Sequence, residues 1–243
     1  MNITFIASPN FTYKRKRVIK YIIIHYTGMR SSKDSLLRLK NPKHKVSCHY
    51  FLDYDGSITQ MVKDQNISWH AGLSYWDGIK NLNSNSIGIE LQNKGEEFGY
   101  EKFGKKQISS LIKLIHNLKI QYNVQDPFIL GHSDIAPDRK IDPGYLFPWD
   151  KLFKAGIGLL PKEILSNQEL LISKIKDLQK LLKEFGYQLE MSTILDQQTL
   201  QVIYAFQSHY CPKELKGFVL KSKLIPYLKS LIKTKNRILT NNI

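Results

Sequence analysis

The stretch that most restricts the fold is residues 18–26, which are apolar or aromatic at every position except Lys20 and His25. Neighbouring side chains of a strand point to opposite faces of a sheet, so a strand that is apolar throughout is covered on both faces. We therefore expect residues 18–26 to form an inner strand of a sheet with other layers packed on both sides. A histidine near the end of such a strand is usually a hydrogen-bonded core residue, unless other ligands converge on it.

Further strands are expected at three places. The runs 46–53 and 57–62 flank an Asp-Gly pair, and Asp-Gly between two such runs predicts a β-hairpin. Residues 86–92 alternate with a period of two, which places Gly88 and Glu90 on the face opposite to the apolar side chains. Glu90 is then either a carboxylate that faces solvent or a base that faces a cleft, and Gly88 leaves room for another group to approach.

Helical spacing of apolar residues predicts one long helix over Lys105–Tyr122, and a second helix is possible near Ser32–Lys40. Between them, residues 69–86 are rich in Ser, Asn and Gly and are expected to form a long irregular loop. Strands combined with helices of this kind predict an α/β fold, in which a mixed central β-sheet is flanked by helices.

A polar loop is expected directly after the apolar run Phe128-Ile129-Leu130. It covers residues 131–144 and reads GHSDIAPDRKIDPG. A neutral imidazole and a carboxylate are ligand types that zinc accepts, so His132 and Asp142 could be two of the three protein ligands of a catalytic zinc site. Ten residues separate them, so the loop would have to fold back, and its prolines and glycines permit this. The alternative is a solvated connection without a metal.

We expect a first domain over residues 1–155, because a connection punctuated by Gly and Pro follows it. A linker is expected at 156–166, and residues 167–243 are expected to form a small domain of three helices. The first of these helices starts at a capping box, Ser166–Glu169, and ends at Gly186. Its predicted apolar face consists of Leu171, Ile175, Leu178, Leu182 and Phe185. The second helix starts at Asp196 with Leu200, Ile203, Phe206 and Tyr210 directed inward, and the third covers about 218–232.

The chain has 36 basic and 21 acidic side chains and a formal net charge of +15, which indicates an anionic partner. Nucleic acid is not the expected partner, because the basic residues are dispersed and no nucleic-acid-binding motif is present. No run of about 18 apolar residues occurs, so no membrane span is expected. The N-terminal residues lack the pattern of a signal peptide, which predicts a cytoplasmic protein; the periplasm or cell envelope is the alternative.

Four stretches together resemble the zinc-dependent N-acetylmuramoyl-L-alanine amidases, in the branch that includes the cytoplasmic recycling amidase and the outer-membrane amidase of Gram-negative bacteria. They occur in the expected order within residues 15–152, and they are Ile22–Thr27, Trp69–Gly72, Asn85–Glu90 and Gly131–Gly144. The resemblance implies one zinc ion per chain, bound by His25, His132 and Asp142. The implied reaction is hydrolysis of the amide between N-acetylmuramic acid, or its anhydro form, and L-alanine in peptidoglycan or muropeptides.

Such an amide is cleaved only if water is activated and the leaving nitrogen receives a proton. Glu90 is the candidate general base for the proton transfers, and Lys140 is the candidate positive charge facing the developing oxyanion. Candidates for contacts with the sugar or peptide of the substrate are Trp69, His70, Asn85 and His49. The alternative function is a non-catalytic protein that recognises peptidoglycan, and such a protein would have no need of Glu90.

The C-terminal part resembles the three-helix peptidoglycan-binding domain. The stretches that carry this likeness are Ile175–Leu182, Phe185–Tyr187, Leu195–Thr199 and Ala205–Gln207. The usual pattern has a glycine shortly before the Leu-Asp pair, whereas this chain has Met191–Ile194 in that place. The resemblance therefore implies the fold of this domain more directly than it implies glycan binding.

Overall fold

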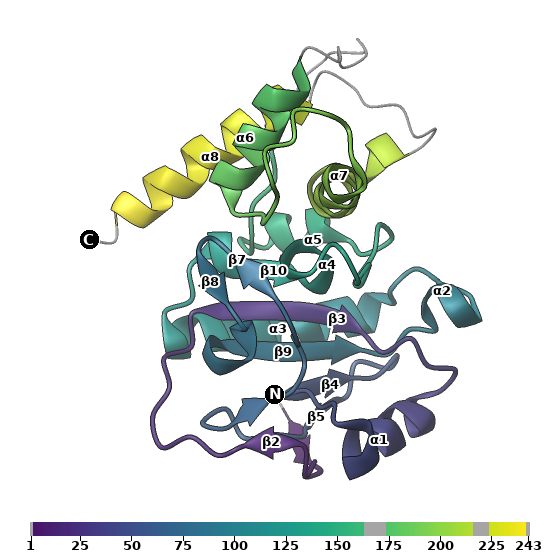
Figure 1. The fold of residues 1–243 in the computed structure, drawn as a ribbon. Helices are drawn as coiled ribbons and strands as arrows, with labels where there is room; N and C mark the ends of the chain where they lie inside the picture. The colour runs from purple at the N-terminus through teal and green to yellow at the C-terminus, as the bar shows by residue number, and fades with distance from the viewer. Residues whose placement is uncertain (1, 163–173, 216–223, 242–243) are drawn as a thin grey trace.

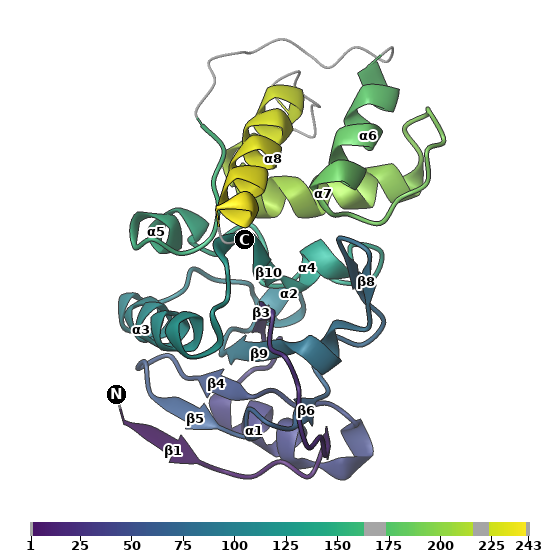
Figure 2. The same ribbon diagram turned by 90° about the vertical axis from the view of Figure 1, so that its left-hand side faces the viewer.

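The computed structural model describes residues 2–162, 174–215 and 224–241 (Figure 1; Figure 2). Its centre is a six-stranded mixed sheet. The strands lie in the order β1 (Ile3–Phe5), β5 (Ile58–Gln60), β4 (Tyr50–Leu52), β9 (Ser86–Leu91), β3 (Tyr21–Tyr26) and β10 (Ile129–Gly131). Strands β10, β3, β9 and β4 are parallel, β5 is antiparallel to β4, and β1 is parallel to β5. This arrangement confirms the predicted α/β class with a mixed central sheet flanked by helices.

The strand predicted over residues 18–26 is β3, which pairs with β9 on one side and with β10 on the other. It begins only at Tyr21, and Val18, which was expected to be covered, is 80% exposed. Its residues Ile22, Ile23 and Ile24 have no exposed surface, as a strand covered on both faces requires. The register aligns β10 residue Gly131 with Ile24, and Glu90 of β9 with His25. The carboxyl ends of three neighbouring strands therefore lie at one level, and ligands commonly bind at such an edge of an open α/β sheet.

The two helices predicted for the first domain are present with the expected bounds. Helix α3 (Lys105–Tyr122) lies behind the central strands in Figure 1, and the Gln107 amide donates hydrogen bonds of 3.2 and 3.0 Å to the carbonyl oxygens of Leu52 and Gln92. Helix α1 (Ser32–Lys40) packs through Leu39 against Phe51 of β4. The sheet is thus held by helices that the spacing of apolar residues predicts.

The connections contain more regular structure than the sequence predicted. Within residues 69–86, expected to be an irregular loop, β7 (Tyr75–Trp76) and β8 (Ile79–Lys80) form an antiparallel pair that the 3-10 helix η2 (Leu82–Asn85) follows. The predicted hairpin is confirmed, although its strands β4 and β5 are shorter than the runs 46–53 and 57–62. The other short elements are β2 (Phe11–Thr12), paired with β6 (Ile67–Ser68), η1 (Pro42–His44), α2 (Gly95–Phe98), η3 (Asp126–Phe128), α4 (His132–Ile135), α5 (Trp149–Lys154) and η5 (Pro212–Leu215).

Three longer helices form the C-terminal part, α6 (Ile175–Phe185), α7 (Gln197–Tyr210) and α8 (Leu224–Thr240). Helix α6 buries the predicted residues Ile175, Leu178, Leu182 and Phe185 and ends at Gly186, which has a positive φ of 143°. Helix α7 starts after Asp196, whose side chain accepts a hydrogen bond from the backbone N–H of Thr199. The first two predicted helices are therefore present where the structure describes them.

Two predictions for the C-terminal part differ from the structure, and several others fall outside the described residues. Leu200 was predicted to point inward, but 46% of its surface is exposed, because the buried face of α7 passes through Thr199, Val202 and Ile203 instead. The third helix was predicted to end near residue 232, but α8 continues to Thr240. The predicted capping box at 166–169, Leu171, part of the 156–166 linker and the start of the third helix at 218–223 lie outside the described residues.

The C-terminal helices share one apolar core with the sheet domain, and Figure 1 shows α7 lying against α4. The ring of Trp76 contacts the rings of Phe185 and Tyr187, with centroids 5.7 and 4.9 Å away. Lys235 is buried; its Nζ lies 2.8 Å from the Asp77 carboxylate and donates to the Phe185 carbonyl oxygen at 2.9 Å. The domain limits 1–155 and 167–243 stay a prediction. The described parts of the two units are packed together.

Across the described ranges, we find no helix with the length and apolar character that crossing a membrane requires.

Candidate metal centre and active site

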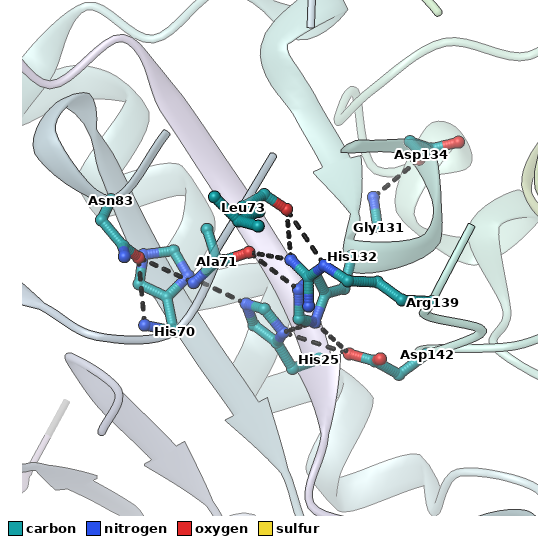
Figure 3. Close-up of polar contacts among 10 residues, drawn as sticks. All are labelled: His25, His70, Ala71, Leu73, Asn83, Gly131, His132, Asp134, Arg139 and Asp142. Carbon is teal, nitrogen blue, oxygen red and sulfur yellow. Dashed lines mark hydrogen bonds and ion pairs between the residues drawn. The ribbon is translucent and has the colours of Figure 1, made fainter. Parts of the chain in front are cut away.

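Three side chains of metal-ligand type meet at the carboxyl ends of β3 and β10. His25 is the fifth residue of β3, His132 follows β10 as the first residue of α4, and Asp142 lies ten residues further along the loop. The two Nδ1 atoms are 3.0 Å apart, and each lies 3.1 Å from Oδ2 of Asp142 (Figure 3). All three residues are buried, and they form a group that could hold a metal ion.

The donor set and its spacing fit a four-coordinate metal such as zinc. Two imidazole nitrogens and one carboxylate oxygen are ligand types that zinc takes, and three protein ligands leave a position open for water or substrate. Ligand atoms bonded at about 2.0–2.2 Å in a tetrahedral site are about 3.3–3.5 Å from one another. The observed separations of 3.0–3.1 Å are close to this value.

The loop between His132 and Asp142 folds back on itself. This is what brings two side chains ten residues apart together. The backbone N–H of Ser133 donates a 2.8 Å hydrogen bond to the carbonyl oxygen of Asp142, which ties the two ends of the loop together. Asp134 accepts a 2.7 Å hydrogen bond from the backbone N–H of Gly131 and caps the single helical turn α4. The sequence did not predict this turn, because four residues carry no helical periodicity.

The hydrogen bond on the outer side of His132 determines which ring nitrogen is free. Nε2 of His132 lies 3.2 Å from the carbonyl oxygen of Ala71, and a carbonyl oxygen can only accept. The proton of a neutral His132 ring is therefore on Nε2. Its Nδ1 keeps a lone pair that points to His25 and Asp142, as a metal ligand requires.

Burial sets the charge states at this centre. It lowers the pKa of His25 to about 4, and His132 acts in the same direction. Burial also lowers the pKa of His70 well below 6.5, with His25 contributing. Burial alone would raise the pKa of Asp142, but His132 and His25 outweigh it and hold that pKa well below its usual range. Near pH 7, His25 and His70 are thus neutral and Asp142 is a carboxylate.

Glu90 stands beside this centre, because it is the register partner of His25 on the neighbouring strand β9. Register partners in a parallel sheet point to the same face, and strands are about 4.8 Å apart. Its carboxyl group is buried, and among the described residues Oε2 has no hydrogen-bond partner. Burial and the nearby Asp142 raise the pKa of Glu90 to about 8, while Lys140 acts in the opposite direction. A buried carboxyl group with one unpaired oxygen is suited to proton transfer.

Lys140 is half-buried on the same loop, two residues before Asp142. Its positive charge acts on both Glu90 and His25, lowering the pKa of each. The backbone N–H of Lys140 donates a 3.0 Å hydrogen bond to the carbonyl oxygen of Ala136, which fixes the chain at this point of the loop. The structure therefore brings Lys140 into electrostatic range of the other site residues.

The four predicted substrate contacts lie at different depths. Trp69 is half-buried and donates a 3.0 Å hydrogen bond from Nε1 to Thr12 Oγ1. Asn85 is half-buried, and its Oδ1 has no hydrogen-bond partner among the described residues. His49 has no exposed surface, and His70 lies against His25 on the side away from the ligand atoms (Figure 3). The roles of these residues toward a substrate stay predictions, and the two histidines lie in the interior.

Two residues that the sequence reasoning did not single out support the site. Asn83 Oδ1 accepts hydrogen bonds from the backbone N–H groups of His70 and Ala71, at 3.1 and 2.7 Å. Arg139 donates a 2.5 Å hydrogen bond to the carbonyl oxygen of Ala71 and also contacts that of Leu73 (Figure 3). Arg139 lies within the stretch Gly131–Gly144, and Asn83 lies just before the stretch Asn85–Glu90. Their side chains bond to backbone groups that are near them only in the folded structure.

A family model and the sequences of known proteins both indicate the same family. The family model described as N-acetylmuramoyl-L-alanine amidase matches residues 15–145. The chain is 36% identical to the N-acetylmuramoyl-L-alanine amidase AmiD of Escherichia coli K12 over 217 residues, which cover 82% of this chain and 77% of that protein. It is 38% identical to the 1,6-anhydro-N-acetylmuramyl-L-alanine amidase AmpD of Haemophilus influenzae over 108 residues, covering 44% of this chain and 56% of that protein.

Two solved structures are similar to this one. E. coli AmiD, in a complex with the substrate anhydro-N-acetylmuramic acid-L-Ala-D-γ-Glu-L-Lys, matches with a TM-score of 0.77 and 29% identity, covering 93% of this chain and 98% of that one. AmpDh3 of Pseudomonas aeruginosa matches with a TM-score of 0.76 and 27% identity, covering 90% of this chain and 92% of that one. The match to AmiD extends over both the sheet domain and the C-terminal helices. The chain belongs to the N-acetylmuramoyl-L-alanine amidase family.

Proposed function

We propose that this amidase binds one zinc ion through His25, His132 and Asp142 and hydrolyses muropeptides between the muramic acid lactyl group and L-alanine. The observation that carries the proposal is the buried triangle of ligand atoms, 3.0–3.1 Å on each side, with Glu90 as the register partner of His25. When bound there, zinc lowers the pKa of a coordinated water to about 7 and polarises the scissile carbonyl.

Glu90 acts as the general base in this proposal. Its carboxylate accepts a proton from the attacking water and returns it to the departing nitrogen. Without a metal, burial raises the pKa of Glu90 to about 8, so the group is largely protonated at neutral pH. A divalent cation nearby favours the carboxylate form and lowers that pKa. The same residue is then a base when the centre is loaded and can carry the proton to the amine afterwards.

Lys140 supplies fixed positive charge for the oxygen of the scissile carbonyl, on which negative charge develops during attack. The electrostatic effect of Lys140 on both Glu90 and His25 supports this role. The backbone bond to Ala136 and the tie between Ser133 and Asp142 hold the loop in place before substrate arrives. A charge that is already oriented costs no reorganisation at the moment of reaction.

The substrate class proposed for the chain is peptidoglycan fragments, including those with an anhydro-muramic end. AmiD was solved with an anhydro-muramyl tripeptide and AmpDh3 with an anhydromuramic pentapeptide. The carboxylates of peptide stems also suit a chain with a net charge of +15.

The test is digestion of anhydro-muropeptide and of intact sacculi side by side, with and without chelator, followed by mass analysis of the released stem peptides. The expected result is release of peptides that begin with L-alanine, loss of activity with chelator and recovery with Zn²⁺. Glu90→Gln should lower kcat by about 10²–10⁴-fold with zinc content unchanged. Glu184→Gln, at an exposed position of α6, is the matched control. Full activity of the Glu90 variant, or of the zinc-free protein, contradicts the proposal.

A further inference from the structure

A chain of hydrogen bonds leads from His25 away from the ligand centre into the interior. Nε2 of His25 lies 3.0 Å from Nδ1 of His70, and Nε2 of His70 lies 3.0 Å from the hydroxyl oxygen of Ser86. The Ser86 hydroxyl oxygen lies 2.6 Å from the carbonyl oxygen of Leu82. His25, His70 and Ser86 are all buried, so bulk water does not replace these contacts.

The donor and acceptor of each hydrogen bond in this series follow from the last contact, between Ser86 and Leu82. Two oxygens 2.6 Å apart need a proton between them, and the Leu82 carbonyl has none, so the Ser86 hydroxyl donates. Ser86 has no second proton, so it accepts from Nε2–H of His70. A neutral imidazole has one N–H, so Nδ1 of His70 can only accept, and Nε2 of His25 donates to it. The proton of His25 is thereby held on Nε2, and its Nδ1 is left free.

The His70 ring occupies a fixed position. A Cβ atom on Gly88 would lie 2.3 Å from Cγ of His70, so the ring lies directly on the glycine of β9. Asn83 holds the His70 backbone, and the rings of His25 and His70 meet edge to face with centroids 5.1 Å apart. The room that Gly88 leaves on the face of Glu90 is therefore filled by this imidazole.

The dipeptide 70–71 serves both histidine ligands. The side chain of His70 accepts a hydrogen bond from Nε2–H of His25. The carbonyl oxygen of the next residue, Ala71, accepts a hydrogen bond from Nε2–H of His132. Both rings thereby point Nδ1 at Oδ2 of Asp142. The same dipeptide fixes the tautomer of each imidazole, although His25 comes from β3 and His132 from α4.

We propose that His70, oriented by Ser86, is a positioning residue of the metal centre: it fixes the His25 tautomer that binds metal. This inference rests on the proposed function, since it assigns His70 to the metal and not to the substrate. Outer partners of metal-bound histidines orient the ring and raise its basicity, and their loss typically costs 10–100-fold in metal affinity or activity.

The test measures the dissociation constant for Zn²⁺ of the full chain by competition with a chromogenic chelator. His70→Leu, which keeps the volume but removes the acceptor, should weaken zinc binding about 10–100-fold. His70→Asn, which can present an amide oxygen to Nε2 of His25, should recover part of that loss. Ser86→Ala should weaken binding about 3- to 10-fold, the factor that corresponds to one net hydrogen bond of ordinary strength.

Ser68→Ala is the matched control, because the Ser68 hydroxyl is equally buried and bonds a histidine, His49, that does not contact the ligand atoms. It should bind zinc within about twofold of the wild type. A second readout is the ¹H–¹⁵N spectrum of the metal-free imidazoles, in which His25 should carry its proton on Nε2 in the wild type and lose this preference in His70→Leu. A purely structural role of His70 would leave that tautomer unchanged.

The outcomes separate this inference from the proposed function. If the wild type binds no zinc, both fail. If the wild type binds zinc and cleaves muropeptides while His70→Leu and Ser86→Ala bind zinc as tightly as the wild type, only the positioning role fails. Equal losses in Ser68→Ala and Ser86→Ala also overturn it, because the effect would then be general to the core. If His70→Leu does not fold, the two serine variants decide.

Discussion

His209 of α7 lies 2.6 Å from Asp134, the residue that caps the helical turn α4. The hydroxyl of Tyr187 donates a second bond of 2.6 Å to the other oxygen of the same carboxyl group. The His209 ring is stacked against Trp149, with centroids 3.5 Å apart. His209 in α7 and Tyr187, just after α6, thus hold the side chain at the base of the loop that carries His132 and Asp142.

His209→Phe should lower the free energy of unfolding by about 2–3 kcal/mol, because it keeps the stacked ring but removes a donor from a buried carboxyl group. Urea denaturation at pH 7 measures this. Asp177→Asn, which breaks an exposed contact of 3.8 Å with Lys174, is the control and should change stability by less than about 1 kcal/mol. Equal stability of the His209 variant and the wild type would show that Tyr187 and Gly131 satisfy the carboxyl group alone.

Asp142→Asn should abolish stabilisation by zinc. A ligand at 100 times its dissociation constant stabilises the folded state by about 2.7 kcal/mol, which is readily seen as a rise in Tm. The wild type should show this rise on addition of Zn²⁺, and the variant should not. Asp150→Asn, at an exposed position of α5, should respond as the wild type does. A zinc-dependent rise in the Asp142 variant would remove this residue from the ligand set.

Gly88→Ala should displace the His70 ring, because the added Cβ would lie 2.3 Å from its Cγ atom. Overpacking of this kind costs about 1–3 kcal/mol of stability. Zinc affinity should fall as well, since the His70 ring supports His25. Gly104→Ala is a suitable control, because a Cβ there meets only the Tyr54 carbonyl oxygen at 3.6 Å. Thermal unfolding and zinc titration of both variants measure these effects. If Gly88→Ala and Gly104→Ala have the same stability and zinc affinity, the His70 ring does not depend on the space at Gly88.

The pKa of Glu90 predicts a pH dependence in chelator-treated protein. Its ordinary pKa is 4.5, and burial raises the pKa in the folded protein to about 8. Between these values the folded state holds a proton that the unfolded state has lost, so this group stabilises the fold at low pH. Its contribution is lost as pH rises from about 4.5 to 8, by at most about 1.4 kcal/mol per pH unit.

Glu90→Gln removes this contribution, so its stability relative to the wild type should increase steadily from pH 5 to pH 8. Denaturant unfolding at several pH values, each with chelator, gives the difference between the two proteins. Comparing the pair cancels the opposite effect of His25, whose lowered pKa adds stability as pH rises. A constant difference across this range would mean that Glu90 is not buried in its neutral form.

The sequence predicted those parts of the fold that local periodicity controls. The apolar run at residues 18–26 predicted β3, and the helical spacing at 105–122 predicted α3. Leu200 was assigned to the wrong face, because α7 buries residues against both α6 and the sheet domain and its buried stripe is broader than one helical face. Which face is covered depends on docking, and periodicity within the helix does not contain that information.

The candidate ligands were found through the combination of four motifs, since His25 alone suggested a core histidine. The partners behind them could not be predicted. The predicted contact of His70 with a substrate stays a prediction. Its ring packs on Gly88 and bonds Ser86, contacts that join a loop to a strand and that the sequence does not indicate. The contact between Asp134 and His209 joins positions 75 residues apart and exists only because the C-terminal helices dock on α4.

The buried contacts at Trp76, Trp149 and Asp134 limit how this enzyme could exchange modules with other wall-active proteins. A crossover in the connection after residue 155 would leave two indole rings and a carboxyl group facing water, or facing side chains that do not fit them. A chimeric lytic enzyme built on this catalytic part would therefore need a donor helix bundle that carries counterparts of Tyr187 and His209, or a redesigned surface in their place.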